Sequence, residues 1–143
     1  MPELIANGIR FHVQDLGTGG TPVVFLHGLV MDNLSSWYFT AGTRVAQKQR
    51  AILVDLRGHG RTERTTSGYD LDTQCRDVLE ILDALNITEP VHLVGNSFGG
   101  YLALHVALHS PEQVASVFLV DGHIGGTNWG SSMAASLRVE GEE

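Results

Sequence analysis

The chain has 143 residues, 43% of them hydrophobic and 17% charged, and its 9 basic and 16 acidic side chains give a formal net charge of −7. This apolar content is enough for one domain, or part of a larger one, with a hydrophobic core, and it excludes a wholly disordered chain. The negative balance and the lack of any Lys/Arg cluster argue against binding to nucleic acid or to an anionic membrane surface, because both attract basic patches.

The first predicted element is a β-hairpin. Residues 4–6 and 9–13 are rich in apolar side chains, and in the second run apolar and polar residues alternate. Between the runs stands Asn7-Gly8, the dipeptide typical of a two-residue hairpin turn. We therefore expect two antiparallel strands at the start of the chain.

Four later apolar runs differ from the hairpin because they do not alternate. They are continuous and rich in Val, Leu and Ile, which predicts parallel strands buried on both faces. One or more glycines follow each run, as expected of loops after strands. The runs are residues 23–26, 52–54, 91–94 and 117–120.

Helical periodicity separates these runs. Residues 71–85 place apolar side chains on one helical face, with Asp70 or Asp72 as the N-cap and Asn86 closing the helix. Residues 98–108 are apolar nearly all round, which predicts a deeply packed helix that ends at Ser110-Pro111. Residues 33–49 form a weaker helical candidate. Strand and helix thus alternate, and the predicted class is α/β, a mostly parallel sheet with helices on both faces and an antiparallel hairpin at its amino-terminal end.

The strongest chemical signal is the pentapeptide Gly95-Asn96-Ser97-Phe98-Gly99, a G-x-S-x-G pattern between a predicted strand and a predicted helix. In that context the pattern predicts a nucleophile elbow, a tight turn that exposes the Ser97 hydroxyl at the carboxyl edge of the sheet. A glycine-rich loop with an incidental serine is the alternative. Phosphate binding is disfavoured, because the chain has neither phosphate-loop pattern and no lysine near this segment.

A second signal is His27-Gly28-Leu29, directly after the strand predicted at residues 23–26. Acyl transfer needs preorganised donors for the oxyanion, and the backbone N–H groups of Leu29 and Phe98 are the expected ones. His27 could be a catalytic base, but its place beside the glycine favours a structural role in the loop.

These motifs, together with residues 55–62 (Asp-Leu-Arg-Gly-His-Gly-Arg-Thr) and residues 120–122 (Val-Asp-Gly), occur in the order and approximate spacing of the α/β-hydrolase superfamily. The chain resembles the branch of small esterases, enol-lactone hydrolases and carbon–carbon bond hydrolases. The resemblance implies a serine hydrolase that forms an acyl-enzyme on Ser97. Dehalogenase and epoxide hydrolase relatives carry aspartate at that position, so their activities are disfavoured. In the family the segment that corresponds to residues 55–62 is a structural turn, which implies loop-shaping roles for Asp55, Arg57 and His59.

The family's chain order is serine, acid, histidine, and the last two normally follow two further strands. The sequence shows no such strands, so we expect residues 1–124 to be a partial hydrolase core and residues 125–143 to start a lid or linker. Asp121 and His123 are the in-chain candidates for the acid and the base, with lid-hinge loop residues as the alternative. The other histidines are expected to be structural or on the surface; His105 and His109 have metal-ligand spacing, but no carboxylate stands between them.

The predicted function is hydrolysis of an ester, lactone or related acyl bond of a small molecule, without cofactor or metal. The alternatives are a non-catalytic hydrolase-like binding module and one half of a two-chain enzyme. If nothing follows Glu143, the strand over residues 115–120 is an open hydrophobic edge, and we expect self-association there or a complementing segment.

Location is predicted from three observations. The longest apolar runs fall far short of the roughly 20 residues that span a bilayer, the amino terminus does not resemble a secretory signal, and Cys75 has no second cysteine to pair with. These observations predict a soluble cytoplasmic protein with no membrane partner.

Overall fold

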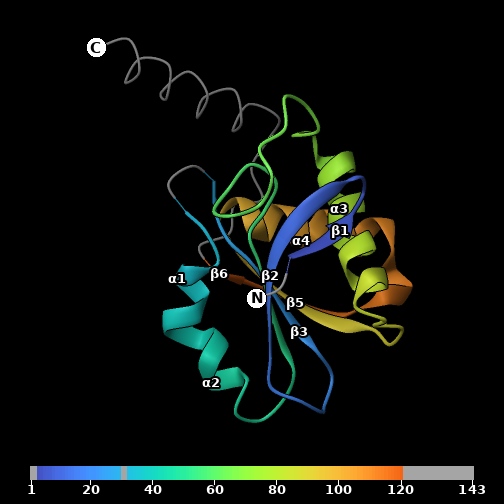
Figure 1. Cartoon of the computed structure of the whole chain (residues 1–143). Coiled ribbons are helices and arrows are strands. Elements are labelled where there is room, and N and C mark those ends of the chain that lie inside the picture. Colours follow the sequence, from blue (N-terminus) through green and yellow to red (C-terminus); the bar gives the residue numbers. More distant parts are fainter. Residues whose placement is uncertain (1–2, 30–31, 121–143) are drawn as a thin grey trace.

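The computed structural model of the chain describes residues 3–29 and 32–120. It contains a six-stranded sheet with the strand order β1-β2-β4-β3-β5-β6 (Figure 1). The strands are β1 (Glu3–Ala6), β2 (Ile9–Leu16), β3 (Val23–Leu26), β4 (Ala51–Val54), β5 (Val91–Asn96) and β6 (Val114–Val120). Strand β2 pairs antiparallel with β1 and β4, and β4, β3, β5 and β6 are mutually parallel. The predicted sheet is therefore confirmed.

The hairpin turn between β1 and β2 has the expected geometry. Asn7 and Gly8 have φ angles of 48° and 78°, so both central residues are in the left-handed region that a type I′ turn requires. The right-handed twist of such a turn matches that of the two strands, and the register follows from it.

Both faces of the central strands are buried, because successive side chains of a strand point to opposite sides. Helices α3 (Leu71–Ala84) and α4 (Phe98–His109) lie on one face, and α1 (Ser35–Trp37), η1 (Tyr38–Gly42) and α2 (Thr43–Val45) lie on the other (Figure 1). The first core contains Val24, Leu26, Ile52 and Val54, and the second contains Val23, Phe25, Ala51 and Leu53.

The two long helices begin and end as the sequence predicts. Asp70 is the N-cap of α3, and its carboxylate accepts a hydrogen bond of 2.9 Å from the Thr73 N–H. Asn86, with a φ of 58°, follows the last residues of that helix in the left-handed conformation common at helix ends. Helix α4 ends at His109, and the short 3₁₀ turn η2 (Pro111–Gln113) leads into β6.

The helix predicted over residues 33–49 is not continuous, and this expectation is corrected. The segment is divided into α1, η1 and α2, and Thr40 has non-helical angles of −124° and −107°. Its hydroxyl donates to the Ser36 carbonyl, a local bond that competes with regular helical pairing. Gly42 then packs so closely on Leu53 that a Cβ at residue 42 would lie 3.0 Å from the Leu53 side chain.

The last strand also differs from its prediction. Phe118 is 64% exposed and Val120 38% exposed, so β6 is not buried on both faces. The reason is its place at the edge of the sheet: Val114 and Val117 pack on the first core, whereas the second core, which includes Trp37 of α1, contains described residues of β3 and β4 and none of β6. The predicted lid or linker at residues 125–143 lies outside the described residues, as do residues 121–124 of the predicted core. None of the described helices is both long and apolar enough to span a membrane.

Candidate active site

The site is built around Ser97, which lies between β5 and α4. Its φ of 53° and ψ of −115° put this non-glycine residue in a region that costs of order 1–3 kcal/mol. The turn has no room for side chains at the positions two residues before and two residues after Ser97. A Cβ on Gly95 would lie 2.3 Å from the Gly99 carbonyl oxygen, and a Cβ on Gly99 would lie 2.2 Å from that of Leu26. The G-x-S-x-G pattern therefore has the steric cause expected of a nucleophile elbow.

Backbone hydrogen bonds hold Ser97 in place. Its N–H donates to the Val120 carbonyl at 3.2 Å, and its own carbonyl accepts from Gly100 and Tyr101 at 3.0 and 3.1 Å. The side chain is half-buried, and within residues 3–29 and 32–120 no partner hydrogen bonds to its hydroxyl. The turn therefore places the Ser97 hydroxyl at the carboxyl edge of the sheet, with no hydrogen-bond partner among the described residues.

The loop after β3 lies directly against this turn. A Cβ built on Gly28 would be 3.7 Å from the Ser97 Cβ and 3.6 Å from the Asn96 carbonyl oxygen. Leu29, the next residue, is 37% exposed, and Phe98 opens α4 with its side chain in the core. The structure thus places the segments that carry the two predicted oxyanion donors, the N–H groups of Leu29 and Phe98, next to each other around Ser97.

His27 lies in the interior beneath this loop. Its side chain is fully buried, its Nδ1 bonds to the Gly28 carbonyl at 2.6 Å, and its Nε2 accepts from the Leu56 N–H at 3.0 Å. Burial lowers the pKa of His27, and repulsion from His59 lowers it further. A neutral imidazole with both nitrogens engaged by the backbone fits the structural role that the sequence favours for His27.

The motif over residues 55–62 forms a hydrogen-bonded loop, the role that the resemblance implies. The buried Asp55 carboxylate accepts from the N–H groups of Leu34 and Arg61 at 2.8 and 3.0 Å and lies 2.8 Å from the His12 Nδ1. These bonds join the loop to β2 and to the segment before α1.

Arg57 and His59 belong to the same loop. Arg57 makes a two-pronged ion pair with Asp77 of α3, at 2.9 and 2.8 Å, and that hydrogen-bonded partner raises the pKa of the guanidinium. The His59 Nδ1 lies 2.9 Å from the Arg57 carbonyl, and its ring centroid is 5.0 Å from that of His27. All these contacts shape the loop.

Sequence reasoning did not identify Asp32. Its carboxylate accepts a hydrogen bond of 2.8 Å from the Gly28 N–H, one of 2.9 Å from the Asn33 N–H, and one from the Ser36 hydroxyl. Burial raises the pKa of this carboxyl, but the three hydrogen bonds outweigh burial and leave the pKa below its usual range. The sequence did contain a signal for Asp32, because an aspartate in a short loop often accepts hydrogen bonds from nearby backbone N–H groups.

The candidates for the acid and the base, Asp121 and His123, lie outside the described residues. The structure therefore places the loop that leads through Gly28 to Leu29 beside Ser97, and Phe98 directly after Ser97 at the start of α4, while the positions of Asp121 and His123 are not described.

The remaining histidines lie elsewhere. The His105 Nε2 bonds to Asp72 at 2.9 Å, and the His92 Nδ1 lies 2.6 Å from the Ser116 hydroxyl. His109 lines a pocket of about 380 Å³ with Asp72, Cys75 and Arg76. Over the described part of the chain, no three His, Cys, Asp or Glu side chains are arranged to hold a metal ion.

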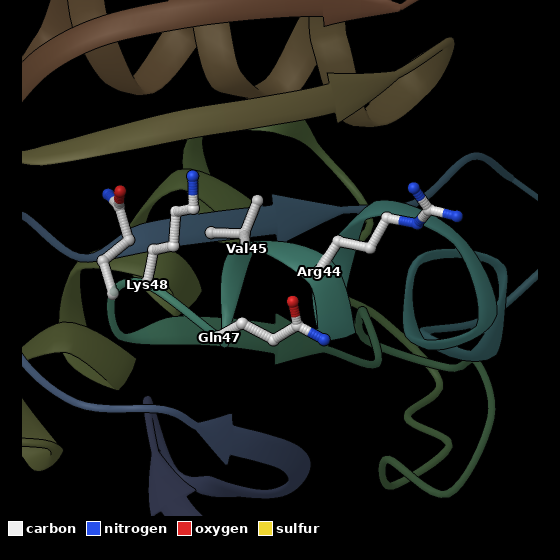
Figure 2. Close-up of a pocket in the computed structure, with 5 residues that line it drawn as sticks. Arg44, Val45, Gln47 and Lys48 are labelled. Carbon is white, nitrogen blue, oxygen red and sulfur yellow. The ribbon is translucent and has the colours of Figure 1, made fainter.

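A second pocket, of about 650 Å³, runs along α2 and the turn after it (Figure 2). The Arg44 and Lys48 side chains give it positive charge, and Val45, Gln47 and Gln49 complete its lining. Neither of these two pockets includes a residue of the elbow, so the hydrolytic chemistry is not assigned to them.

Comparison with known proteins identifies the family to which the chain belongs. The family model for the alpha/beta hydrolase fold matches residues 21–139. Among curated proteins, the chain is 41% identical over 104 residues to the dihydrolipoyllysine-residue acetyltransferase component of the acetoin cleaving system of Pseudomonas putida, covering 73% of this chain and 27% of that protein. It is 36% identical over 121 residues to a 2-hydroxymuconate semialdehyde hydrolase of Pseudomonas sp. (strain CF600), covering 82% and 42% of the two chains.

A solved structure agrees with these matches. An esterase from Exiguobacterium antarcticum superimposes with a TM-score of 0.76 at 32% identity, over 84% of this chain and 44% of that one. The chain spans less than half the length of each of these three relatives.

The chain belongs to the alpha/beta hydrolase fold family, and within it to the branch of esterases and carbon–carbon hydrolases. Its family is one of enzymes, and the class of activity that the fold and the relatives support is hydrolysis.

Proposed function

We propose that the protein is a serine hydrolase that cleaves an ester, a lactone or a related acyl bond of a small molecule. Ser97 is the nucleophile, and the N–H groups of Leu29 and Phe98 form the oxyanion hole. The observation that carries the proposal is the Ser97 backbone, whose φ of 53° between β5 and α4 is the strained conformation of a nucleophile elbow and lies beside the Gly28 loop.

The reaction has two steps. Ser97 Oγ loses its proton to a base and attacks the acyl carbon, the carbonyl oxygen becomes an oxyanion that the two N–H groups stabilise, and the bond to the leaving group breaks as that group takes up a proton. Water then attacks the acyl-enzyme, releases the acid and returns the proton to Ser97. His27 is not the base, because both of its ring nitrogens are engaged.

Other features belong to the same proposal. The enzyme works without a cofactor or metal, on a small acyl substrate, and binds neither nucleic acid nor membrane. We place it in the cytoplasm, because its free Cys75 is buried and carries no disulfide. Relatives that are an esterase and a semialdehyde hydrolase support the substrate class.

A non-catalytic binding module of the same fold is the second candidate. It is favoured by one observation, that no group in the described ranges hydrogen bonds to the Ser97 hydroxyl. This candidate predicts ligand binding without turnover, and binding that survives Ser97→Ala. One half of a two-chain enzyme is a variant of the first proposal, in which a second chain supplies the base.

Turnover of a panel of p-nitrophenyl esters and lactones separates these candidates. The whole polypeptide is expressed from its own gene, with Ser97→Ala as the test variant and Ser116→Ala, on exposed β6, as the control. The hydrolase proposal predicts that only Ser97→Ala loses turnover, by at least 10³-fold, since the attacking group is gone. Equal turnover by both variants contradicts the proposal.

A further inference from the structure

Asp32 makes a contact whose position gives it a role in the proposed chemistry. Its Oδ2 accepts the Gly28 N–H at 2.8 Å, and the ideal Cβ position on Gly28 lies 3.3 Å from that oxygen and 3.7 Å from the Ser97 Cβ. Gly28 is therefore hydrogen-bonded to the Asp32 carboxylate and lies next to the candidate nucleophile.

The backbone of Gly28 is held at both of its polar groups. Asp32 accepts a hydrogen bond from the Gly28 N–H, and the buried His27 imidazole donates one from Nδ1 to the Gly28 carbonyl at 2.6 Å. In a trans peptide the carbonyl of one residue and the N–H of the next point in opposite directions. Because the Gly28 carbonyl faces His27, the Leu29 N–H points away from that interior histidine.

The carboxylate is itself fixed. Its other oxygen, Oδ1, accepts from the Asn33 N–H at 2.9 Å and from the Ser36 hydroxyl, which belongs to α1. Three donors thus hold one short side chain, and hydrogen bonds to an ionised acceptor are about twice as strong as neutral ones. The start of α1 is in this way connected to the loop beside Ser97.

We propose that Asp32 is a positioning residue for oxyanion stabilisation: together with His27 it clamps Gly28, so that the Leu29 N–H is held ready for the oxyanion that forms at Ser97. The inference rests on the proposed function for its chemical meaning, whereas the clamp itself is a property of the loop. Oxyanion stabilisation depends on donors that are oriented before the reaction, and removing one such donor typically costs a factor of about 10²–10³ in rate.

The clamp needs an acceptor oxygen at residue 32 and not a negative charge. A carboxylate this close to a developing oxyanion repels it, so charge alone would oppose the reaction. Asp32→Asn keeps one oxygen, which can accept the Gly28 N–H at the expense of the bonds that the second carboxylate oxygen accepts, and Asp32→Ala removes both oxygens. A role in positioning therefore predicts that asparagine rescues what alanine loses.

The test compares these two variants in the polypeptide expressed from its own gene, with Asp70→Ala as the control. Asp70 is a matched aspartate whose carboxylate accepts the Thr73 N–H at the start of α3, away from the Ser97 loop. The first readout is the rate constant for covalent labelling of Ser97 by a fluorophosphonate, per folded molecule. We expect Asp32→Ala to lower it about 10- to 100-fold, and Asp32→Asn and Asp70→Ala to stay within about threefold of the unsubstituted protein.

The second readout is amide hydrogen exchange and ¹⁵N relaxation of Gly28 and Leu29, which needs no reaction at Ser97. We expect Asp32→Ala to lose protection at Gly28 and order at Leu29, and Asp32→Asn to keep both. Unchanged exchange and relaxation in Asp32→Ala overturn the inference, as does a labelling rate equal to that of the unsubstituted protein. If the unsubstituted protein is not labelled, the proposed function fails, while the exchange data still decide whether the clamp exists.

Discussion

At the scale of single residues, Ser97 depends on the small size of its neighbours. A Cβ on Gly99 would meet two backbone carbonyl oxygens, at 2.2 Å from Leu26 and 2.6 Å from His27. Backbone atoms cannot turn aside as a side chain can. The conformation at Ser97 therefore holds only while residue 99 lacks a side chain.

We predict that Gly99→Ala destabilises the protein by about 1–3 kcal/mol, the usual cost of overpacking, and lowers the reactivity of Ser97. Gly100→Ala is the control. Its Cβ would approach its neighbours less closely than that of Gly99→Ala, at 3.1 Å from the Leu119 side chain and 3.2 Å from the Gly95 carbonyl oxygen, so we expect a smaller loss of stability. Urea unfolding measures both variants. An equal decrease in the free energy of unfolding of the two variants would contradict the importance of the close approach between residue 99 and the Leu26 and His27 carbonyl oxygens.

His27 gives a prediction about pH. Burial, aided by His59, lowers its folded-state pKa, although Asp32, Asp55 and the bond to Gly28 act in the other direction. In the unfolded chain the imidazole regains its ordinary pKa of about 6.5 and takes up a proton that the folded protein does not. The free energy of unfolding is therefore unaffected by His27 above about pH 6.5, and falls as the pH drops below it, down to the folded-state pKa.

Unfolding curves between pH 7.5 and 5 test this, with His27→Gln as the comparison. Glutamine can still donate to Gly28 and accept from Leu56, but it does not titrate. We expect the variant to lose less stability than the unsubstituted protein over this pH range, and parallel pH profiles would contradict the assignment.

At the scale of elements, α3 shows what local sequence determines. Its N-cap, Asp70, accepts from Thr73, and the helix ends near Asp83 and the left-handed Asn86. We predict that Asp70→Ala destabilises the protein, because the Thr73 N–H in the first turn of α3 loses its acceptor. Asp83→Ala, which removes a negative charge at the unfavourable end of the same helix, should be neutral or slightly stabilising. Thermal unfolding measures both, and the reverse order would contradict the account.

The strands and long helices were predictable because each has a strong local signal. Periodicity defines α3, continuous Val, Leu and Ile define β3 and β4, and Asn-Gly defines the hairpin turn. The break at Thr40 was not predicted, although its hydroxyl bonds locally to the Ser36 carbonyl; the close packing of Gly42 on Leu53 of β4 has no signal in the local sequence. The exposure of Phe118 depends on which strands α1 and α2 cover, and a local sequence pattern does not determine that coverage.

The same distinction applies to the site. The motifs were enough to predict Ser97, Leu29 and Phe98 as site residues, because each motif directly follows a strand along the chain. Asp32 was missed because its role appears only when Gly28 is seen beside Ser97, a contact between residues about 70 positions apart. Contacts of this kind come from the sheet order β4-β3-β5, not from sequence spacing.

At the scale of the whole molecule, the open edge of the sheet is the main feature. Among the described residues, strand β6 pairs with β5 alone, carries no charged residue, and exposes Phe118, which belongs to neither core. Natural edges are usually protected by charge or by a covering element. We propose that the 143-residue chain by itself associates through this edge.

We predict that Phe118→Lys weakens this association, because it places a charge on the uncovered face. Leu108→Lys is the control, since Leu108 is 83% exposed but lies on α4. Sedimentation velocity over a range of protein concentrations measures both variants. A chain that is monomeric at all concentrations and melts cooperatively would contradict the proposal.

The most direct test of the central claim is covalent labelling of Ser97. The polypeptide expressed from its own gene is treated with a fluorophosphonate, digested and mapped by mass spectrometry. The account predicts one adduct on the peptide that carries Ser97, absent in Ser97→Ala and retained in Ser116→Ala. No adduct on folded protein, or an adduct only at another residue, would contradict the claim that this elbow presents a reactive serine.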